Sequence, residues 1–280
     1  MSRFGSKEEE ALIEAVRAVS RAEILPRFRA LGRAEVDSKS APDDLVTIAD
    51  KAAEHAIGAR VAEILPSARI IGEEAVATDA SLLDGIAHPG LTVIIDPIDG
   101  TWNYANGLST FGVILAVVED GETILGLLYD PSGDDWIVAR KGDGAWYDGA
   151  NRRAEKLTAS AAPPRLDETM GFVGLYLYGK ADQARIAATL PEFRRTYSLR
   201  CSCHEYRMMA QGRADFVLNG MLNPWDHAAG VLALEEAGGV ARLLDGTPYR
   251  PTMTDGLLLT AGNAALWDRL ADLWSPLNRS

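Results

Sequence analysis

The chain has 280 residues, of which 47% are hydrophobic and 24% charged, and its 28 Lys and Arg against 40 Asp and Glu give a formal net charge of -12. Ordinary globular proteins have this composition, which excludes wholesale disorder and fibrous repeats, and the length predicts one large domain or two fused ones. The acidic balance argues against nucleic acid and anionic membranes as partners, because phosphate-rich surfaces select basic proteins.

The cysteines and the N-terminus bear on the compartment. Cys201 and Cys203 are two positions apart on one short segment, so no disulfide framework is expected. The first ten residues, MSRFGSKEEE, lack the apolar core of a signal peptide. The longest aliphatic stretch, 112–118, is far short of the roughly 20 residues that a membrane helix needs. We therefore expect a cytoplasmic protein.

The chain is predicted to begin with two helices. Apolar residues recur at helical spacing over 7–30 and again from about 48 to 65, where Pro66 ends the pattern. A short apolar pair, Ile70-Ile71, then leads into a loop, Gly72-Glu73-Glu74, that bears two carboxylates.

Strands are predicted next. The continuous run LTVIID (91–96) is rich in β-branched residues and predicts a buried strand that ends in Pro-Ile-Asp-Gly-Thr. Between Phe111 and Tyr147, three apolar runs separated by turn signals predict an antiparallel meander. The polar segment 150–168, which contains prolines, is a candidate boundary.

The second half alternates strands with helices, which predicts an α/β arrangement. The predicted strands lie near 170–175, 196–201, 214–218, 239–244 and 257–260. The predicted helices cover 180–190, 203–211, 226–237 and 263–274.

Two carboxylates follow the buried strand in the segment Asp96-Pro97-Ile98-Asp99-Gly100-Thr101. Backbone pairing ends there, so the side chains can converge, and a glycine allows the backbone to approach a ligand closely. A threonine that opens a helix offers its hydroxyl and nearby amides to an anion. Carboxylate and carbonyl oxygens select hard cations such as Mg²⁺. Taken alone, the segment is equally compatible with two ordinary turns.

Further acids occur at predicted helix starts. Asp44 and Asp50 surround the start of the second helix, where simple N-capping is the plainer interpretation. Asp226 lies in Asn-Pro-Trp-Asp-His-Ala-Ala-Gly (223–230), and it too can be an N-cap. The small residues that follow it predict unusually close packing of this helix.

Together, four segments resemble the motifs of the inositol monophosphatase family of metal-dependent phosphomonoesterases, in their order and spacing and over essentially the whole chain. They are DLVTIAD (44–50), GEEA (72–75), IIDPIDGTWNY (94–104) and NPWDHAAG (223–230). The resemblance implies the layered α-β-α-β-α sandwich of the inositol monophosphatase and fructose bisphosphatase type. It implies an α+β half over 1–155, an α/β half over 156–280, a site between them, and a homodimer.

The resemblance also implies residue roles. The implied metal ligands, for two or three Mg²⁺ ions, are Glu73, Asp96, the Ile98 carbonyl, Asp99 and Asp226. Glu73 and Thr101 would orient the attacking water, with Asp50 holding the Thr101 hydroxyl, and hydrolysis would proceed without a phosphoenzyme. The implied substrate contacts are Asp99, Gly100, Thr101, Ser202, Asn219 and Asp226. Glu74 and Asp44 would support this arrangement, and Li⁺ is expected to inhibit.

The sequence departs from the family pattern at the substrate pocket. Asn219 stands seven positions before Asp226, where inositol phosphatases have an acidic residue, and the loop 200–205 (RCSCHE) stands where they have small residues. Arg200 in this loop is equally compatible with adding a positive charge to the pocket and with a surface or helix-flanking role. The substrate is therefore expected to be a small phosphate monoester, inositol monophosphate or a related polyol phosphate. A histidinol-phosphate or sugar phosphatase, and a non-catalytic regulatory protein with the same fold, are the alternatives.

Other signatures are weaker. Cys201 and Arg207 have the Cys-x₅-Arg spacing of a cysteine phosphatase, but the intervening residues lack the glycines of a phosphate-binding loop. His227 lies beside Asp226, where a packing or surface role is a simpler interpretation than contact with the site. Trp102 and Tyr104 are interpreted as aromatic anchors of the loop rather than as substrate platforms.

Overall fold

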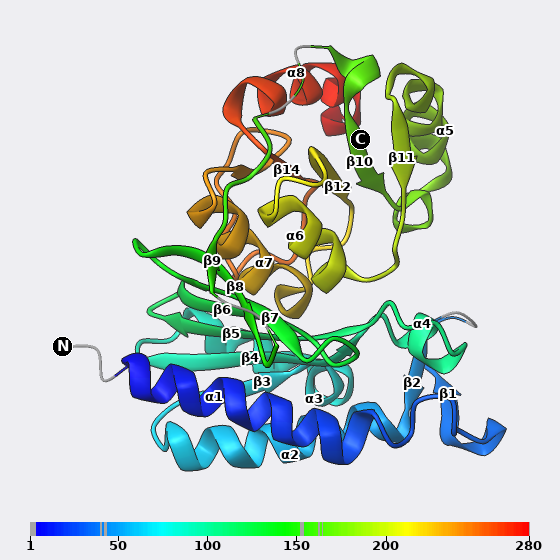
Figure 1. Cartoon of the computed structure of the whole chain (residues 1–280). Helices are drawn as coiled ribbons and strands as arrows, with labels where there is room; N and C mark the ends of the chain where they lie inside the picture. Colours follow the sequence, from blue (N-terminus) through cyan, green and yellow to red (C-terminus); the bar gives the residue numbers. More distant parts are fainter. Residues whose placement is uncertain are drawn as a thin grey trace.

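Two β-sheets and the helices that cover them form five layers, helix, sheet, helix, sheet and helix, in the computed structural model (Figure 1). The structure describes residues 4–39, 41, 44–151, 154–161, 163 and 165–279. Parts of the polar segments at 38–47 and 150–168, like residues 1–3, lie outside the described residues. Along the described chain, no helix combines the length and apolar character needed to cross a membrane.

The elements have the following bounds. The helices are α1 (Ser6–Val19), α2 (Ile48–Ile64), α3 (Glu73–Thr78), α4 (Thr101–Ala105), α5 (Lys180–Thr189), α6 (Ser202–Ala210), α7 (Pro224–Glu236) and α8 (Ala264–Trp274). The strands are β1 (Val36–Ser38), β2 (Leu45–Thr47), β3 (Arg69–Gly72), β4 (Leu91–Asp99), β5 (Gly112–Glu119), β6 (Glu122–Asp130), β7 (Asp135–Arg140), β8 (Gly144–Gly149), β9 (Glu155–Lys156), β10 (Met170–Val173), β11 (Arg195–Tyr197), β12 (Phe216–Asn219), β13 (Val240–Leu243) and β14 (Leu258–Ala261).

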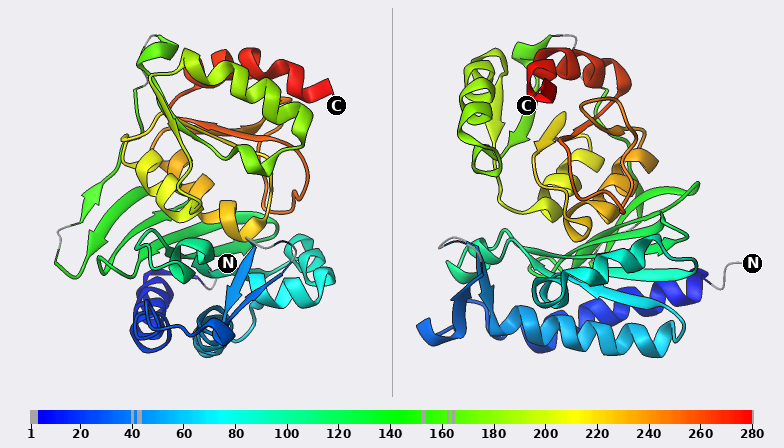
Figure 2. Two further views of the ribbon diagram at one scale, coloured as in Figure 1. Left: turned by 90° about the vertical axis from the view of Figure 1, so that its right-hand side faces the viewer. Right: turned by 180° about the vertical axis from the view of Figure 1, so that it is seen from behind.

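The larger sheet has seven strands in the order β3-β4-β5-β6-β7-β8-β9, with only β3 and β4 parallel. Helices α1 and α2 cover one face, while α6 and α7 cover the other, as the two turned views show (Figure 2). Because successive side chains of β4 point to opposite faces, Val93 and Ile95 pack with α1 and α2 while Ile94 packs with α7. Burial on both faces explains why the run is continuously apolar.

The smaller sheet has five strands in the order β11-β10-β12-β14-β13. Its outer face is covered by α5 and α8, through side chains such as Ile186 and Trp267 packed near Leu218. Its inner face meets the same layer, α6 and α7, that covers the larger sheet, with Val217 in this shared core. The central helical layer therefore joins both sheets.

The layered sandwich is confirmed, and most predicted elements are present. The first helix is shorter than expected: α1 ends at Val19, a π-helical turn follows over Ser20–Ile24, and Pro26 prevents regular continuation to residue 30. The meander has four strands, β5–β8, rather than three. The division between 1–155 and 156–280 stays a prediction, and β9 lies across it in the larger sheet.

Candidate metal centre

A β-bulge at the end of β4 turns Asp96 and Asp99 toward the same side of the sheet. Asp96 pairs with Ile114 and Asp99 with Gly112, so β4 has one more residue than β5 between these pairs. In a regular strand, side chains three positions apart point to opposite faces. The extra residue cancels this alternation, so Ile98 enters the core beneath α1 and α2 and both carboxylates face α7. Pro97, which has no N–H to donate, suits the interrupted ladder.

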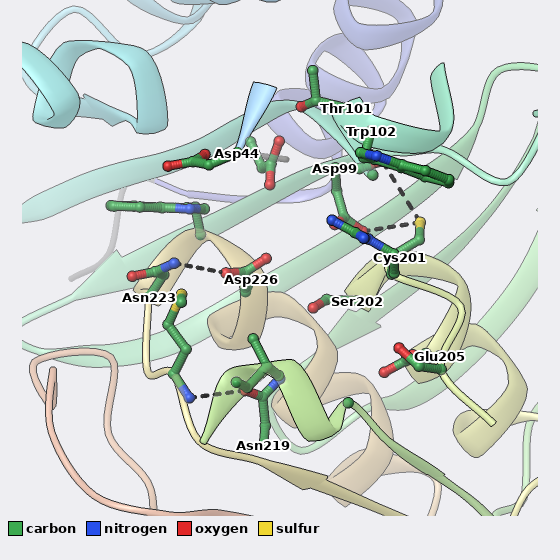
Figure 3. Close-up of a pocket in the computed structure, with 18 of the residues that line it drawn as sticks. Asp44, Asp99, Thr101, Trp102, Cys201, Ser202, Glu205, Asn219, Asn223 and Asp226 are labelled. Carbon is green, nitrogen blue, oxygen red and sulfur yellow. Dashed lines mark hydrogen bonds between the residues drawn. The ribbon is translucent and has the colours of Figure 1, made fainter. Parts of the chain in front are cut away.

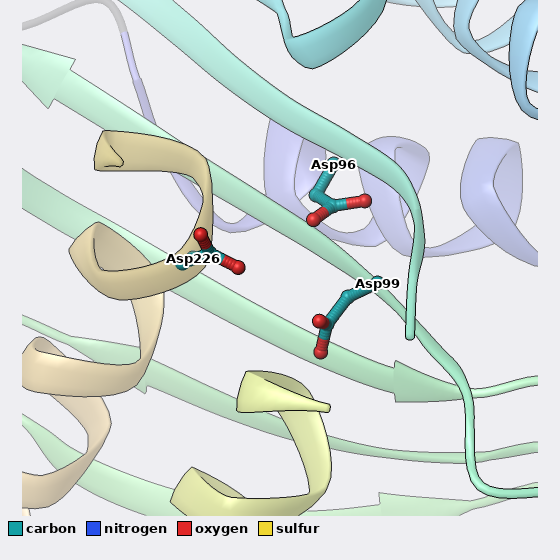
Figure 4. A group of neighbouring side chains, drawn as sticks. All are labelled: Asp96, Asp99 and Asp226. Carbon is teal, nitrogen blue, oxygen red and sulfur yellow. The ribbon is translucent and has the colours of Figure 1, made fainter. Parts of the chain in front are cut away.

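The third carboxylate, Asp226, comes from the first turn of α7 (Figure 4). Pro224 opens the helix, and the Asn223 side chain donates a hydrogen bond from Nδ2 to Asp226 Oδ2 at 3.0 Å. The small residues after it allow the predicted close packing: a Cβ on Gly126 of β6 would lie 2.5 Å from the Ala229 carbonyl oxygen. This approach brings the start of α7 down onto the end of β4.

One oxygen from each of Asp96, Asp99 and Asp226 lies within 4.8 Å of the other two. Asp96 and Asp99 are only 2% and 6% exposed. Burial first, and then the charge of Asp226, raises the pKa of Asp99 to about 7, while burial raises the pKa of Asp226 to about 6. Burial, with repulsion from Glu73 and Asp99, also raises the pKa of Asp96. A hard divalent cation would relieve this repulsion, and the all-oxygen donor set fits one.

Glu73 stands at the first position of α3 and faces the same cavity as the three aspartates. Burial raises the pKa of its carboxyl group, whereas Lys39 opposes that shift. Lys39 Nζ lies 2.8 Å from Glu73 Oε1 and 2.6 Å from Glu74 Oε1. Sequence reasoning missed Lys39, because a lysine in a polar loop has no spacing that ties it to a motif 34 residues away.

Glu54 was also missed as a site residue, and its position explains why residue 72, just before Glu73, is a glycine. Its carboxylate accepts hydrogen bonds from the backbone N–H groups of Glu74 and Ala75 at 2.7 and 2.9 Å, so it caps the start of α3. A Cβ on Gly72 would lie 2.2 Å from Glu54 Cδ. The glycine therefore admits the carboxylate that fixes the backbone beside Glu73.

Asp50 is fully buried behind Thr101. Thr101 Oγ1 lies 3.0 Å from Asp50 Oδ1 and 3.0 Å from the Ile98 carbonyl oxygen. Asp50 Oδ2 accepts hydrogen bonds from the backbone N–H and the hydroxyl of Thr47, which is the N-cap of α2. Burial raises the pKa of Asp50 to about 7 despite these hydrogen bonds. The carboxylate at a helix start thus has two tasks, capping α2 and holding Thr101.

The remaining predicted residues line a cavity of about 400 Å³ between β4, α6, β12 and α7 (Figure 3). Except for Asp50, every predicted site residue lines it: Glu73, Asp96, Ile98, Asp99, Gly100, Thr101, Ser202, Asn219 and Asp226. Gly100 has φ +84°, and a Cβ there would lie 3.0 Å from the Thr110 carbonyl oxygen, so this turn needs glycine. Asn219 Oδ1 accepts from the Met221 N–H at 2.9 Å, so its amide offers a ligand hydrogen-bond donors.

The Cys-x₅-Arg spacing, His227 and Tyr104 all have structural explanations. Arg207 forms a buried ion pair with Asp135, and burial raises the pKa of the Cys201 thiol well above its usual value, so a cysteine nucleophile does not fit. His227 packs as expected, with Nδ1 3.0 Å from the Tyr206 hydroxyl. Tyr104 anchors its loop by donating to the Ile24 carbonyl at 2.7 Å.

Trp102 differs from its neighbour Tyr104 because it lines the cavity. Trp225, which belongs to the motif at 223–230, also lines the cavity, and so do Tyr176 and Met221, which were missed. Apolar residues outside a motif have no sequence pattern that predicts this position.

Known proteins match this chain over most of its length. The inositol monophosphatase family model matches residues 6–275. An inositol-1-monophosphatase of Bacillus subtilis (strain 168) is 31% identical over 234 residues, 82% of this chain and 83% of that protein. The Nus factor SuhB of Salmonella typhimurium (strain LT2) is 32% identical over 213 residues, 72% of this chain and 73% of that protein. The solved structure of a Thermotoga maritima IMPase superposes with a TM-score of 0.80 at 26% identity, covering 96% of this chain and 97% of that one.

Sequence, fold and acidic cluster thus agree: the chain belongs to the inositol monophosphatase family, whose members are generally metal-dependent phosphatases of small phosphate monoesters.

Proposed function

We propose that this protein is a Mg²⁺-dependent phosphatase that hydrolyses a small phosphate monoester, inositol monophosphate or a related polyol phosphate. The main support is the convergence of Asp96, Asp99 and Asp226 in one cavity with the backbone turn at Gly100 and Thr101. Carboxylates of this density suit divalent cations, and a glycine turn that opens a helix suits phosphate oxygens.

The proposed ligands for two or three Mg²⁺ ions are Glu73, Asp96, the Ile98 carbonyl, Asp99 and Asp226. When bound, Mg²⁺ supplies positive charge to phosphoryl oxygens and lowers the pKa of water. Crowded carboxylates and an anionic substrate become compatible in this way, because the ions reverse the local sign of charge.

The chain's own residues would orient the water and the phosphate. When Thr101 donates its hydroxyl hydrogen to Asp50, lone pairs on Oγ1 are left to accept a hydrogen bond from the attacking water. Glu73 would accept the other hydrogen bond from that water, and the Gly100 and Thr101 amides would bind phosphate oxygens. Asp99, Ser202, Asn219 and Asp226 would contact the rest of the substrate. Since the Cys201 thiol resists ionisation, we propose direct attack by water, without a phosphoenzyme.

We also propose that the protein is a cytoplasmic homodimer, that the site lies between the halves 1–155 and 156–280, and that Li⁺ inhibits it. Two alternatives have specific support. Asn219 in place of an acid favours a histidinol-phosphate or sugar phosphatase. The similarity to a protein named Nus factor SuhB favours a regulatory role for the same fold.

The test is phosphate release from inositol 1-phosphate, glycerol 2-phosphate, histidinol phosphate and a sugar phosphate, with Mg²⁺ and then with EDTA. We expect Mg²⁺-dependent release from at least one substrate, and a loss of more than about 100-fold in Asp96→Asn. Asp268→Asn, an exposed aspartate of α8, is the matched control and should keep full activity. Release by no substrate would overturn the proposal in favour of the regulatory alternative, and near-normal turnover by Asp96→Asn would overturn the assigned site.

A further inference from the structure

Glu205 is a buried acid that the proposed mechanism does not use. It belongs to α6 and lines the cavity, yet it is only 8% exposed. Ser202 stands three positions before it, so both side chains lie on one face of the helix, on the α6 wall of the cavity (Figure 3). The proposed metal ligands come from α3, β4 and α7, so a bound metal ion gives no reason for an acid on α6.

Helix α6 is held against the candidate metal centre at its first turn. The backbone N–H of Cys203 donates a hydrogen bond to Asp99 Oδ2, and Cys201 Sγ lies 3.1 Å from the same oxygen. Glu205 follows Cys203 by less than one turn of the helix. The contact with Asp99 therefore fixes where the Glu205 carboxyl group stands relative to the proposed phosphate site.

The carboxyl group of Glu205 has one hydrogen-bond partner along the described chain. The backbone N–H of Leu199 donates to Oε1 at 2.8 Å, while no group within the described ranges donates to Oε2. A buried polar group that lacks hydrogen bonds costs folding free energy. A neutral acceptor, such as the side chain of glutamine, would serve Leu199 as well. The contact with Leu199 therefore does not explain why this residue is an acid.

The surroundings of Glu205 disfavour its charge. Burial is the largest effect, and the charges of Asp99 and Asp226 add to it, so the pKa of Glu205 rises to about 8 although the hydrogen bond from Leu199 opposes the shift. A carboxylate in this position needs hydrogen-bond donors. A hydroxyl group of a substrate is such a donor, and its hydrogen bond to a carboxylate is about twice as strong as one between neutral groups.

We infer that Glu205 determines specificity by binding, through Oε2, a hydroxyl group on the part of the substrate that leaves with the ester oxygen. This inference rests on the proposed phosphatase function and deepens it: it selects phosphate esters of alcohols that carry further hydroxyl groups, as inositol monophosphate and other polyol phosphates do. Asn219 of β12 lines the same cavity, and its amide offers a donor to another hydroxyl of such a substrate.

The test compares substrates that share a carbon skeleton and differ in their hydroxyl groups. Isopropyl phosphate is glycerol 2-phosphate without its hydroxyl groups, and cyclohexyl phosphate is inositol 1-phosphate without them. Steady-state kinetics with saturating Mg²⁺, at about pH 9 to ionise Glu205, give kcat/KM for both pairs. The variants are Glu205→Met, which removes both oxygens, and Glu205→Gln, which keeps an acceptor for Leu199 and guards against misfolding. Glu192→Gln, at an exposed glutamate before β11, is the control.

We expect the preference for the polyol phosphate over its hydroxyl-free partner to fall about 10- to 100-fold in Glu205→Met and about three- to tenfold in Glu205→Gln, mainly through KM of the polyol phosphate. Loss of this preference in either variant, with the control unchanged, supports the inference. Equal losses on both members of a pair, or no loss in either variant, would limit Glu205 to holding the loop at Leu199 and would overturn the inference. A wild-type enzyme without the preference overturns it as well.

The same measurements separate this inference from the proposed function. If the wild-type enzyme hydrolyses other phosphates of the earlier panel but neither polyol phosphate, the inference fails and the phosphatase proposal stands. If it hydrolyses none of these substrates, the phosphatase proposal itself fails, and this inference fails with it.

Discussion

Lys39 and Glu73 form an ion pair at the edge of the acidic cavity, with Nζ and Oε1 2.8 Å apart. The Lys39 side chain is only 16% exposed, and it also meets Glu74. Burial lowers the pKa of Lys39, but the two carboxylates outweigh that effect and raise it, so the ammonium stays charged. Without a bound metal ion, this one cation offsets part of the repulsion among the acids.

Replacing Lys39 should therefore change how the protein responds to Mg²⁺. We expect Lys39→Gln to unfold at a lower temperature in EDTA, because the acids lose their internal cation. We expect it to need several-fold less Mg²⁺ for half-maximal stabilisation, because the metal no longer competes with an ammonium for Glu73. Thermal unfolding across a Mg²⁺ titration measures both effects. Lys180→Gln, at an exposed lysine of α5, is the control, and identical titrations for the two variants would contradict this role of Lys39.

The contact between Glu54 and Gly72 makes a second prediction. Gly72→Ala places a methyl group where the Glu54 carboxylate lies, so it should cost about 1–3 kcal/mol of folding free energy. Glu54→Gln replaces one of two capping oxygens with an amide, which should cost about 1 kcal/mol and weaken Mg²⁺ binding through Glu73. Urea unfolding with and without Mg²⁺ measures both the loss of folding free energy and the change in Mg²⁺ binding. Glu63→Gln, exposed on the same helix, should behave as wild type, and unchanged Mg²⁺ binding in Glu54→Gln would refute the positioning role.

The aspartate cluster predicts that folding stability changes with pH in opposite directions with and without bound metal. The pKa of Asp99 is about 7 and that of Asp226 about 6 in the metal-free protein, against roughly 4 in an unfolded chain. Between these values the folded state binds more protons than the unfolded state, so its stability falls as pH rises from about 4 to about 7. With saturating Mg²⁺, deprotonation favours metal binding, and stability should rise over the same window. Melting temperatures at several pH values test this, and parallel trends in EDTA and Mg²⁺ would rule it out.

Thr101 allows a test of the proposed water-orienting group. Thr101→Val keeps the shape of the side chain but removes the hydroxyl that lies 3.0 Å from Asp50. We expect its kcat to fall about 100-fold or more, with KM changed little, while Thr101→Ser keeps most of the activity. Initial rates on the best substrate from the panel, with melting curves to verify folding, provide the measurement. A valine variant with near-normal kcat would remove Thr101 from the mechanism.

Features of this molecule that depend on residues close together in the sequence can be predicted from it, whereas features that depend on contacts between distant segments cannot. Helix α2 is predicted closely because its apolar spacing and its capping residues are local. The acidic residues of the site, such as Asp96 and Asp99, could be predicted because two carboxylates at this spacing after a buried strand are an unusual pattern. Local patterns could not predict the ion pair between Lys39 and Glu73, because these two residues lie in segments that share no motif and that meet only in the folded protein. Arg200 and Tyr176 are a similar case: their ring contact depends on the turn after β10 and the loop before α6.

The β4 bulge has a consequence for how this site can evolve. Asp96 and Asp99 share a face only because three steps along β4 match two along β5. If this segment kept its length but paired with β5 without the bulge, regular pleating would send one of the two carboxylates into the apolar interior beneath α1 and α2. Natural variation should therefore tolerate new side chains between the two aspartates more readily than loss of the bulge. The bulge is thus as necessary to this site as the two acids that it brings to one face.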